Sequence, residues 1–357
     1  MRRLAVLTTA LALLAAVPAS DGAGRAKWDT KVTSQIPRPG FPAHAYAAPN
    51  GRVYEGTYDN PSGDTSASRV FELDPGPEQA PMGTLVRSWT ITGQDLSQAH
   101  GVQVATSDAR GRLVLLDKSP PRVLLLDTKT GRQRTYATFP AGAVPNYAAW
   151  GPDGSLYVTD YLQPYVWRVP PLGGKPVQWL TDPYLMGGQF GATGIQLLPD
   201  RKTLMIGMQS EGGPGVGDPA TGRLLKVTIG PDGKPGKLSQ FWESQPFDGP
   251  DGFAIAKSGN VYVAILVANQ IAVIGPDGKE KERFPSTPAT GANGSAVPFD
   301  NPSSVQFLGD RVFVANQSYF QGSATTQAVL DVEVGEPGLR RLIPRNAGGK
   351  PPRRKRH

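Results

Sequence analysis

The stretch that decides the fold lies in the middle of the chain, at residues 147–180, and reads YAAWGPDGSLYVTDYLQPYVWRVPPLGGKPVQWL. It contains four short apolar segments, at 147–150, 155–160, 165–170 and 177–180, with turn residues between them. Gly151-Pro152-Asp153-Gly154 has the chemistry of a hairpin turn, because proline presets φ and glycine admits positive φ. The stretch therefore predicts four consecutive antiparallel strands.

The pattern of apolar strand, turn and second apolar strand occurs six times along the chain. The first apolar residues after the six turns are Val53, Leu113, Leu156, Leu204, Val261 and Val312. They lie 43 to 60 residues apart, a period that suits a four-stranded propeller blade. A ring of blades leaves few exposed sheet edges. We therefore predict an all-β fold, a single six-bladed β-propeller over residues 28–344, with two separate β-sandwiches as the alternative.

Two segments compete to complete the sixth blade. Residues 29–36 follow the same layout as the outer strand at 132–139, which leads into the next blade. Residues 339–343, which follow the predicted strand at 328–334, are the competing candidate. The sequence leaves both closures open.

The charge of the chain is concentrated at its two ends. Of 37 basic residues, eight lie at positions 2–3 and 345–356, so 29 remain against 30 acidic residues. A body without net charge lacks the electrostatic footprint of nucleic-acid binding. The chain has no cysteine, which excludes disulfides and thiol chemistry.

The two ends predict an exported protein. Residues 1–19 have the pattern of a secretory signal peptide, with Arg2 and Arg3 before an apolar run that is too short to span a membrane. We expect a secreted or periplasmic monomer without a transmembrane segment. Residues 345–357 form a basic, disordered tail, which either solubilises the protein or contacts an anionic envelope surface.

Candidate site residues lie where the inner strands begin, because these positions converge on the channel of a propeller. All six are polar: His44, His100, Asn146, Thr193, Asp251 and Ser303. Buried polar groups need partners or a ligand, so their convergence predicts a binding or catalytic site. The alternative is that each residue caps its own strand through a local hydrogen bond.

Two segments carry a family resemblance. GPDGFAIAKSGNVYVAILVANQIAVIGPDGKEKERFP, from Gly249, and VPNYAAWGPDGSLYVTDYLQPYVWRV, from Val144, resemble the gluconolactonase, regucalcin (senescence marker protein) and luciferin-regenerating enzyme family. The resemblance implies a six-bladed propeller with a divalent metal ion, calcium or zinc, in its channel. It also implies a hydrolase that acts on lactones or related esters.

The resemblance assigns roles to individual residues. Asp251 matches the family's metal-binding aspartate, which also serves as a base, and Asn146 matches an asparagine that binds metal or substrate. Thr193 stands where a second asparagine ligand is expected, and His44 stands where a glutamate is expected. These two departures leave two alternatives. Either His44 binds the metal, which favours zinc, or the metal is lost and the propeller only binds a ligand.

The segment PRVLLLDTKTGRQRTYATFP, from Pro121, is similar to the royal jelly and yellow protein family, which includes such binding propellers. If the chain is an enzyme, Asp251 and Asn146 hold the metal, and His100 or His44 acts as general base at neutral pH. Tyr147, Tyr161 and Ser303 are the candidate contacts for a small-molecule substrate.

Overall fold

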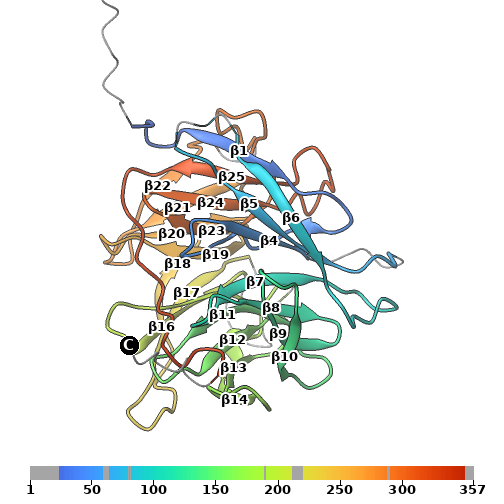
Figure 1. The fold of residues 1–357 in the computed structure, drawn as a ribbon. Helices are drawn as coiled ribbons and strands as arrows, with labels where there is room; N and C mark the ends of the chain where they lie inside the picture. The colour runs from blue at the N-terminus through green and yellow to red at the C-terminus, as the bar shows by residue number, and fades with distance from the viewer. Residues whose placement is uncertain are drawn as a thin grey trace, which may run out of the picture.

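The computed structural model describes residues 24–58, 64–78, 80, 82–188, 190–210, 220–287 and 290–349. Over these residues the regular structure is β, apart from one short 3-10 helix at Pro183–Leu185. Six sheets surround a central channel (Figure 1), so the predicted six-bladed propeller is confirmed. The predicted signal peptide and residues 350–357 of the basic tail lie outside the described residues. In the described part of the chain, no helix is long and apolar enough to cross a membrane.

In each blade the strands lie in the order given, from the channel outward, and the N-terminal strand is the outermost strand of blade 6. Blade 1 comprises β2 (Phe41–Pro42), β3 (Tyr46–Ala47), β4 (Val53–Tyr58), β5 (Arg69–Asp74) and β6 (Thr84–Thr90). Blade 2 comprises β7 (Val102–Ser107), β8 (Leu113–Lys118), β9 (Pro121–Leu126) and β10 (Gln133–Thr138). Blade 3 comprises β11 (Pro145–Trp150), β12 (Leu156–Asp160), β13 (Tyr165–Val169) and β14 (Val177–Thr181). Blade 4 comprises β15 (Ala192–Leu197), β16 (Thr203–Met208), β17 (Arg223–Thr228) and β18 (Ser239–Glu243). Blade 5 comprises β19 (Pro250–Ile255), β20 (Val261–Ile265), β21 (Gln270–Ile274) and β22 (Glu280–Phe284). Blade 6 comprises β23 (Pro302–Leu308), β24 (Arg311–Asn316), β25 (Ala328–Glu333) and β1 (Thr30–Gln35).

Blade 3 has the four strands predicted from residues 147–180, and their ends agree to within two residues. The turn at its tip also has the expected chemistry. Gly154 adopts a φ of 86°, and its N–H donates to the Gly151 carbonyl at 3.0 Å. Asp153 accepts a 3.0 Å hydrogen bond from the Ser155 N–H. Positive φ and the carboxylate acceptor together reverse the chain between β11 and β12.

The N-terminal strand closes the ring. β1 pairs antiparallel with β25, with Thr30 opposite Val332 and Gln35 opposite Ala328, and it forms the outer edge of blade 6 (Figure 1). Of the two closures that the sequence left open, the structure thus selects residues 29–36. Residues 339–343 belong to a C-terminal strap, residues 337–349, which contacts blade 5 through the Leu339 N–H and blade 3 through Asn346.

The core lies between the blades. The described residues contain six buried apolar clusters, one at each interface between neighbouring blades. Trp150 of blade 3 is 2% exposed, packs against blade 2 and donates to the Ser107 carbonyl there at 2.9 Å. Inner strands such as β7, β11 and β19 are buried along their whole length, which explains why most of their residues are apolar or small. This packing holds the beginnings of the inner strands in a fixed ring.

Candidate functional site

Two of the predicted residues meet at one cavity. Asn146, near the beginning of β11, and Asp251, near the beginning of β19, line a cavity of about 250 Å³ at the end of the channel where the inner strands begin. We call it the Asp251 cavity. Its other polar lining residues are Tyr58, Gln103, Lys118, Tyr161, Gln209, Gln317 and Tyr319. Its size and mixed lining suit a small organic molecule.

Asp251 is the carboxylate of the cavity. Its side chain is 8% exposed, and burial raises its pKa well above the usual carboxyl range. Neighbouring Gly252 is required for space, since a Cβ atom there would lie 2.6 Å from the Tyr147 hydroxyl and 2.9 Å from the Ser303 carbonyl oxygen. Close approach of the blades at Gly252 therefore positions the carboxyl group next to it.

Asn146 presents an amide to the same cavity. Its Nδ2 donates to the Ala192 carbonyl of blade 4 at 3.3 Å, which fixes the orientation of the side chain. Its Oδ1 accepts no hydrogen bond from the described residues, so this oxygen is available to a ligand. Gln103 of β7 adds a second such oxygen, because its Oε1 is buried and has no partner among the described residues.

His44 lies deeper in the channel and does not line the Asp251 cavity. The side chain is fully buried, and the centroid of its ring lies 4.6 Å from the ring centroid of Tyr147. Neither ring nitrogen of His44 has a hydrogen-bond partner among the described residues. Burial, together with the positive charge of Arg341, lowers the pKa of His44 well below its ordinary value. The neutral imidazole is therefore strongly favoured, which makes His44 a weak proton acceptor.

His100 anchors local backbone. Its Nδ1 lies 2.8 Å from the Gln98 carbonyl oxygen, and its Nε2 lies 2.8 Å from the Ser66 carbonyl oxygen. The ring does not line the Asp251 cavity. With both nitrogens directed at carbonyl groups, neither is free to take a proton from a substrate or a water molecule.

Thr193 and Ser303 connect neighbouring blades. The Thr193 hydroxyl donates to the Asp251 carbonyl at 3.1 Å, and the Ser303 hydroxyl donates to the Ala43 carbonyl at 2.8 Å. Both side chains are buried outside the lining of the Asp251 cavity. Their hydrogen bonds run between blades, so they position the strand on which Asp251 lies and the link between β2 and β3 on which Ala43 lies.

The predicted tyrosines occupy different depths. Tyr161 lines the cavity, and its hydroxyl donates to Gln209 Oε1 at 2.8 Å. Tyr147 is buried below the cavity and donates to the Ser303 carbonyl at 2.8 Å. Tyr161 can contact a ligand directly, whereas Tyr147 supports the residues that do.

Sequence reasoning missed a buried carboxyl group. Glu55 of β4 is fully buried, and its Oε1 accepts hydrogen bonds from the N–H groups of Ala43, His44 and Gly56 at 3.0 to 3.1 Å. Burial raises the pKa of Glu55 to about 8. The signal was present, since Glu55 is a charged residue in the middle of the otherwise uncharged strand VYEGTY.

Sequence reasoning also missed several polar residues of the cavity itself, among them Gln103 and Lys118. Gln103 lies in the apolar inner strand β7, and Lys118 is the last residue of β8. Both side chains reach the Asp251 cavity. A polar residue inside a buried inner strand is the signal for Gln103, whereas a lysine at a strand end predicts nothing by itself.

Comparison with known proteins identifies the family. The profile described as the SMP-30/gluconolactonase/LRE-like region matches residues 85–309, more than half of the chain. The chain belongs to this family. No protein with a curated description is similar enough in sequence to match.

Solved structures share the fold of this family member. The calcium-binding protein regucalcin from Agrobacterium tumefaciens is 17% identical over 90% of this chain and 96% of its own, with a TM-score of 0.57. A gluconolactonase from Xanthomonas campestris is 17% identical over 87% and 99%, with a TM-score of 0.51. Virginiamycin B lyase from Staphylococcus aureus is 12% identical over 85% and 98%, with a TM-score of 0.54.

The donor atoms of this SMP-30/gluconolactonase-like propeller allow a test of the expected metal ion. The Asp251 cavity offers one carboxylate and the amide oxygens of Asn146 and Gln103, the last of them buried without a partner. Oxygen donors suit a hard cation such as calcium. Among the described residues, no three His, Cys, Asp or Glu side chains lie close enough together to hold a metal ion. The ring of His44 lies outside the cavity. The donor set therefore fits calcium better than zinc, with less negative charge than calcium sites commonly have.

Proposed function

We propose that this chain is a hydrolase that opens lactones or related esters in the Asp251 cavity. The observation that carries the proposal is the meeting of Asp251 and Asn146, from blades 5 and 3, at one small-molecule cavity. Membership of the SMP-30/gluconolactonase/LRE-like family supports a lactonase-type reaction.

Asp251 acts as the base in this proposal. Its carboxylate accepts a proton from a water molecule, whose oxygen forms a bond to the substrate carbonyl carbon. The ring C–O bond then breaks, and the departing oxygen takes the proton back from Asp251. The product is a hydroxy acid, so Asp251 returns to its starting state. A raised pKa makes Asp251 a stronger base than an ordinary carboxylate, as this step requires.

The other lining residues bind and orient the substrate. The Lys118 ammonium group is the cation of the cavity lining, so we place it near the oxygen that gains negative charge. The Asn146 amide is held by its bond to Ala192 and faces the substrate. Tyr161 and Tyr319 contribute aromatic surface at the rim.

A divalent cation, calcium before zinc, forms part of the proposal. Asp251, Asn146 and Gln103 would hold it, and when bound it would supply a Lewis acid that polarises the substrate carbonyl. Calcium binding is measured directly by calorimetry on chelator-treated protein. We expect binding to the parent and its loss in Asp251→Asn. If the parent binds no divalent cation, the cation is removed from the proposal and the reaction by Asp251 stands.

The hydrolase proposal is tested with a panel of five- and six-membered lactones and aryl esters. Turnover of at least one compound by the parent, and its loss in Asp251→Asn and Asn146→Ala, is the expected result. Asp232→Asn is the matched control, because Asp232 is an exposed aspartate in an outer turn. Unchanged turnover in both cavity variants, with folding retained, would refute the assignment.

Export remains a proposal that rests on the sequence. We propose that residues 1–19 direct secretion and are removed after Ala19, and that the basic tail meets an anionic envelope surface. Expression of the full chain in a host with an export pathway, followed by N-terminal sequencing, should give Ser20 as the first residue. A cell-associated product that retains Met1 would contradict export.

A further inference from the structure

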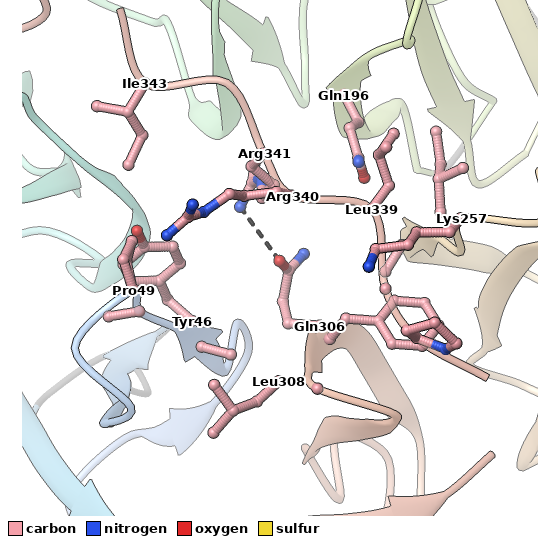
Figure 2. A pocket seen from close by; sticks show the side chains of 18 residues that line it. Tyr46, Pro49, Gln196, Lys257, Gln306, Leu308, Leu339, Arg340, Arg341 and Ile343 are labelled. Atoms are coloured by element: carbon pink, nitrogen blue, oxygen red, sulfur yellow. Dashed lines mark hydrogen bonds between the residues drawn. The ribbon is translucent and has the colours of Figure 1, made fainter. Parts of the chain in front are cut away.

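A second cavity occupies the opposite end of the channel. It has a volume of about 410 Å³ and lies between the C-terminal strap and the ends of the inner strands (Figure 2). We call it the Arg341 cavity. Gln306 and Leu308 line it from blade 6, Lys257 lines it from blade 5, and Arg340 and Arg341 line it from the strap. None of these residues belongs to the Asp251 cavity.

The charge of the Arg341 cavity is positive and uncompensated. Its lining includes Lys257, Arg340 and Arg341 but contains no aspartate or glutamate. The Arg341 guanidinium donates to the carbonyl groups of Ala105 and Ala148 at 3.1 and 3.0 Å. It forms no ion pair with any carboxylate of the described residues. A partly buried cation without a counterion is unfavourable, and a bound anion would neutralise it.

Two buried glutamines also face this cavity. Gln306 Oε1 accepts a 3.2 Å hydrogen bond from Arg341, the contact drawn as a dashed line in Figure 2. Gln196 is 4% exposed, lines the same cavity, and its amide makes no hydrogen bond within the described part of the chain. Since Gln196 lines the cavity, its amide is a further donor for a ligand.

Apolar side chains complete the lining. Leu308, Leu339 and Ile343 surround the cationic groups in Figure 2. A hydrated inorganic ion would leave this apolar surface without a partner, whereas an organic anion would cover it while its head group meets the guanidinium groups.

We propose that the Arg341 cavity binds a small organic carboxylate with an apolar body. The carboxylate pairs with Arg341 and Arg340, Lys257 adds long-range attraction, and the apolar body lies against Leu308, Leu339 and Ile343. This site is separate from the hydrolase site, and the proposal does not rest on the proposed reaction.

The test is calorimetric titration of the full chain with acetate, hexanoate and phenylacetate, and with the neutral phenylacetamide. We expect affinity to rise from acetate to phenylacetate, and phenylacetamide to bind at least about tenfold more weakly than phenylacetate. The double variant Arg340→Gln with Lys257→Gln should weaken phenylacetate binding about tenfold. Both residues are exposed, so the variant keeps the strap's contacts with the blades.

A matched control removes the same charge elsewhere. Arg345→Gln with Lys279→Gln eliminates two exposed cations outside the cavity and should leave binding unchanged. Lys118→Gln, at the Asp251 cavity, should also leave phenylacetate binding unchanged. Three results would overturn the proposal. They are an equal loss of phenylacetate binding in the control variant, a dependence of that binding on Lys118 instead of Arg340 and Lys257, and no binding of any carboxylate by the parent. Inorganic phosphate that displaces phenylacetate at equal concentration would overturn the role of the apolar body.

Discussion

The two ends of the channel differ in charge although six similar strands build both. The Asp251 cavity is lined by a carboxyl group, amides, tyrosines and one lysine, and the Arg341 cavity is lined by three cations without an acid. The strap supplies two of those cations, Arg340 and Arg341. The difference in charge therefore comes largely from the strap, which lies at one end of the channel only, whereas the blades themselves follow one pattern.

One repeated residue serves both ends. Gln103, Gln196 and Gln306 occupy the same repeat position, in GVQV, GIQL and SVQF. Gln103 lies opposite Leu116, whereas Gln196 and Gln306 lie opposite Met205 and Phe313. Leu116 lies three residues after Leu113, whereas Met205 and Phe313 lie one residue after Leu204 and Val312. Gln103 is therefore two residues closer to the Asp251 end of the channel.

The length of the inner strand beyond the glutamine, together with a β-bulge, explains this difference. In blades 4 and 6 the bulge precedes the glutamine, between Ala192 and Ile195 and between Pro302 and Ser304. In blade 2 it follows the glutamine, between Val104 and Thr106. Gln103 lies four residues before Ser107, the partner of Leu113, whereas Gln196 and Gln306 lie one residue before Leu197 and Phe307, the partners of Leu204 and Val312. The bulge in blade 2 takes up one of these three extra residues, and the remaining two place Gln103 at the Asp251 cavity.

The largest expected effect separates the two ends by chemistry. Asp251→Asn should lower kcat for the best lactone or ester about 10³-fold, because it removes the base but keeps the size of the side chain. Steady-state kinetics measure this effect, and the phenylacetate affinity of the same variant should not change. A parallel loss of carboxylate binding would show that the two cavities are not independent.

The second prediction concerns stability and depends on Glu55. Its folded pKa of about 8 lies above its unfolded value, so its contribution to stability is full at low pH and is lost as the pH rises through 8. Between pH 5 and pH 8 this loss is on the order of 3 kcal/mol in the free energy of unfolding. Glu55→Gln keeps an oxygen for the three N–H groups and should lack that loss. Urea unfolding of both proteins at the two pH values measures the difference, and identical pH dependence would contradict the assignment.

The third prediction uses the pair of glutamines. Gln103→Leu should weaken calcium binding or turnover at the Asp251 end about tenfold, because it removes one oxygen donor. Gln196→Leu should leave that end unchanged and alter phenylacetate affinity instead. Calorimetry with each ligand on each variant completes the comparison. Effects of both variants at the same end would show that the difference in strand register does not divide their roles.

The fourth prediction is the pH profile of turnover. Because burial raises the pKa of Asp251, kcat/KM should rise tenfold per pH unit below that raised pKa and level off above it. A bound cation favours the ionised carboxylate, so a chelator should move the rise to higher pH. A rise centred in the ordinary carboxyl range with the chelator present would argue against Asp251 as the base.

Much of the site could be predicted because the repeat is regular. Asn146 and Asp251 were singled out from their position at the beginning of inner strands, and both line the cavity. His100 occupies the equivalent position, yet its ring is held by the backbone of residues 66 and 98. A loop that is distant in sequence decides that outcome, so strand position alone could not predict it.

The sequence by itself determined the number of blades, the four strands of blade 3 and the polar ring at one end of the channel. These features follow from local periodicity and turn chemistry, which act over a few residues. The tertiary structure alone decided that β1 closes blade 6, that residues 337–349 bring Arg340 and Arg341 to the channel, and that Glu55 lies buried beneath His44. These outcomes depend on contacts between segments far apart in the chain and on bulges that shift register, and neither leaves a periodic trace in the sequence.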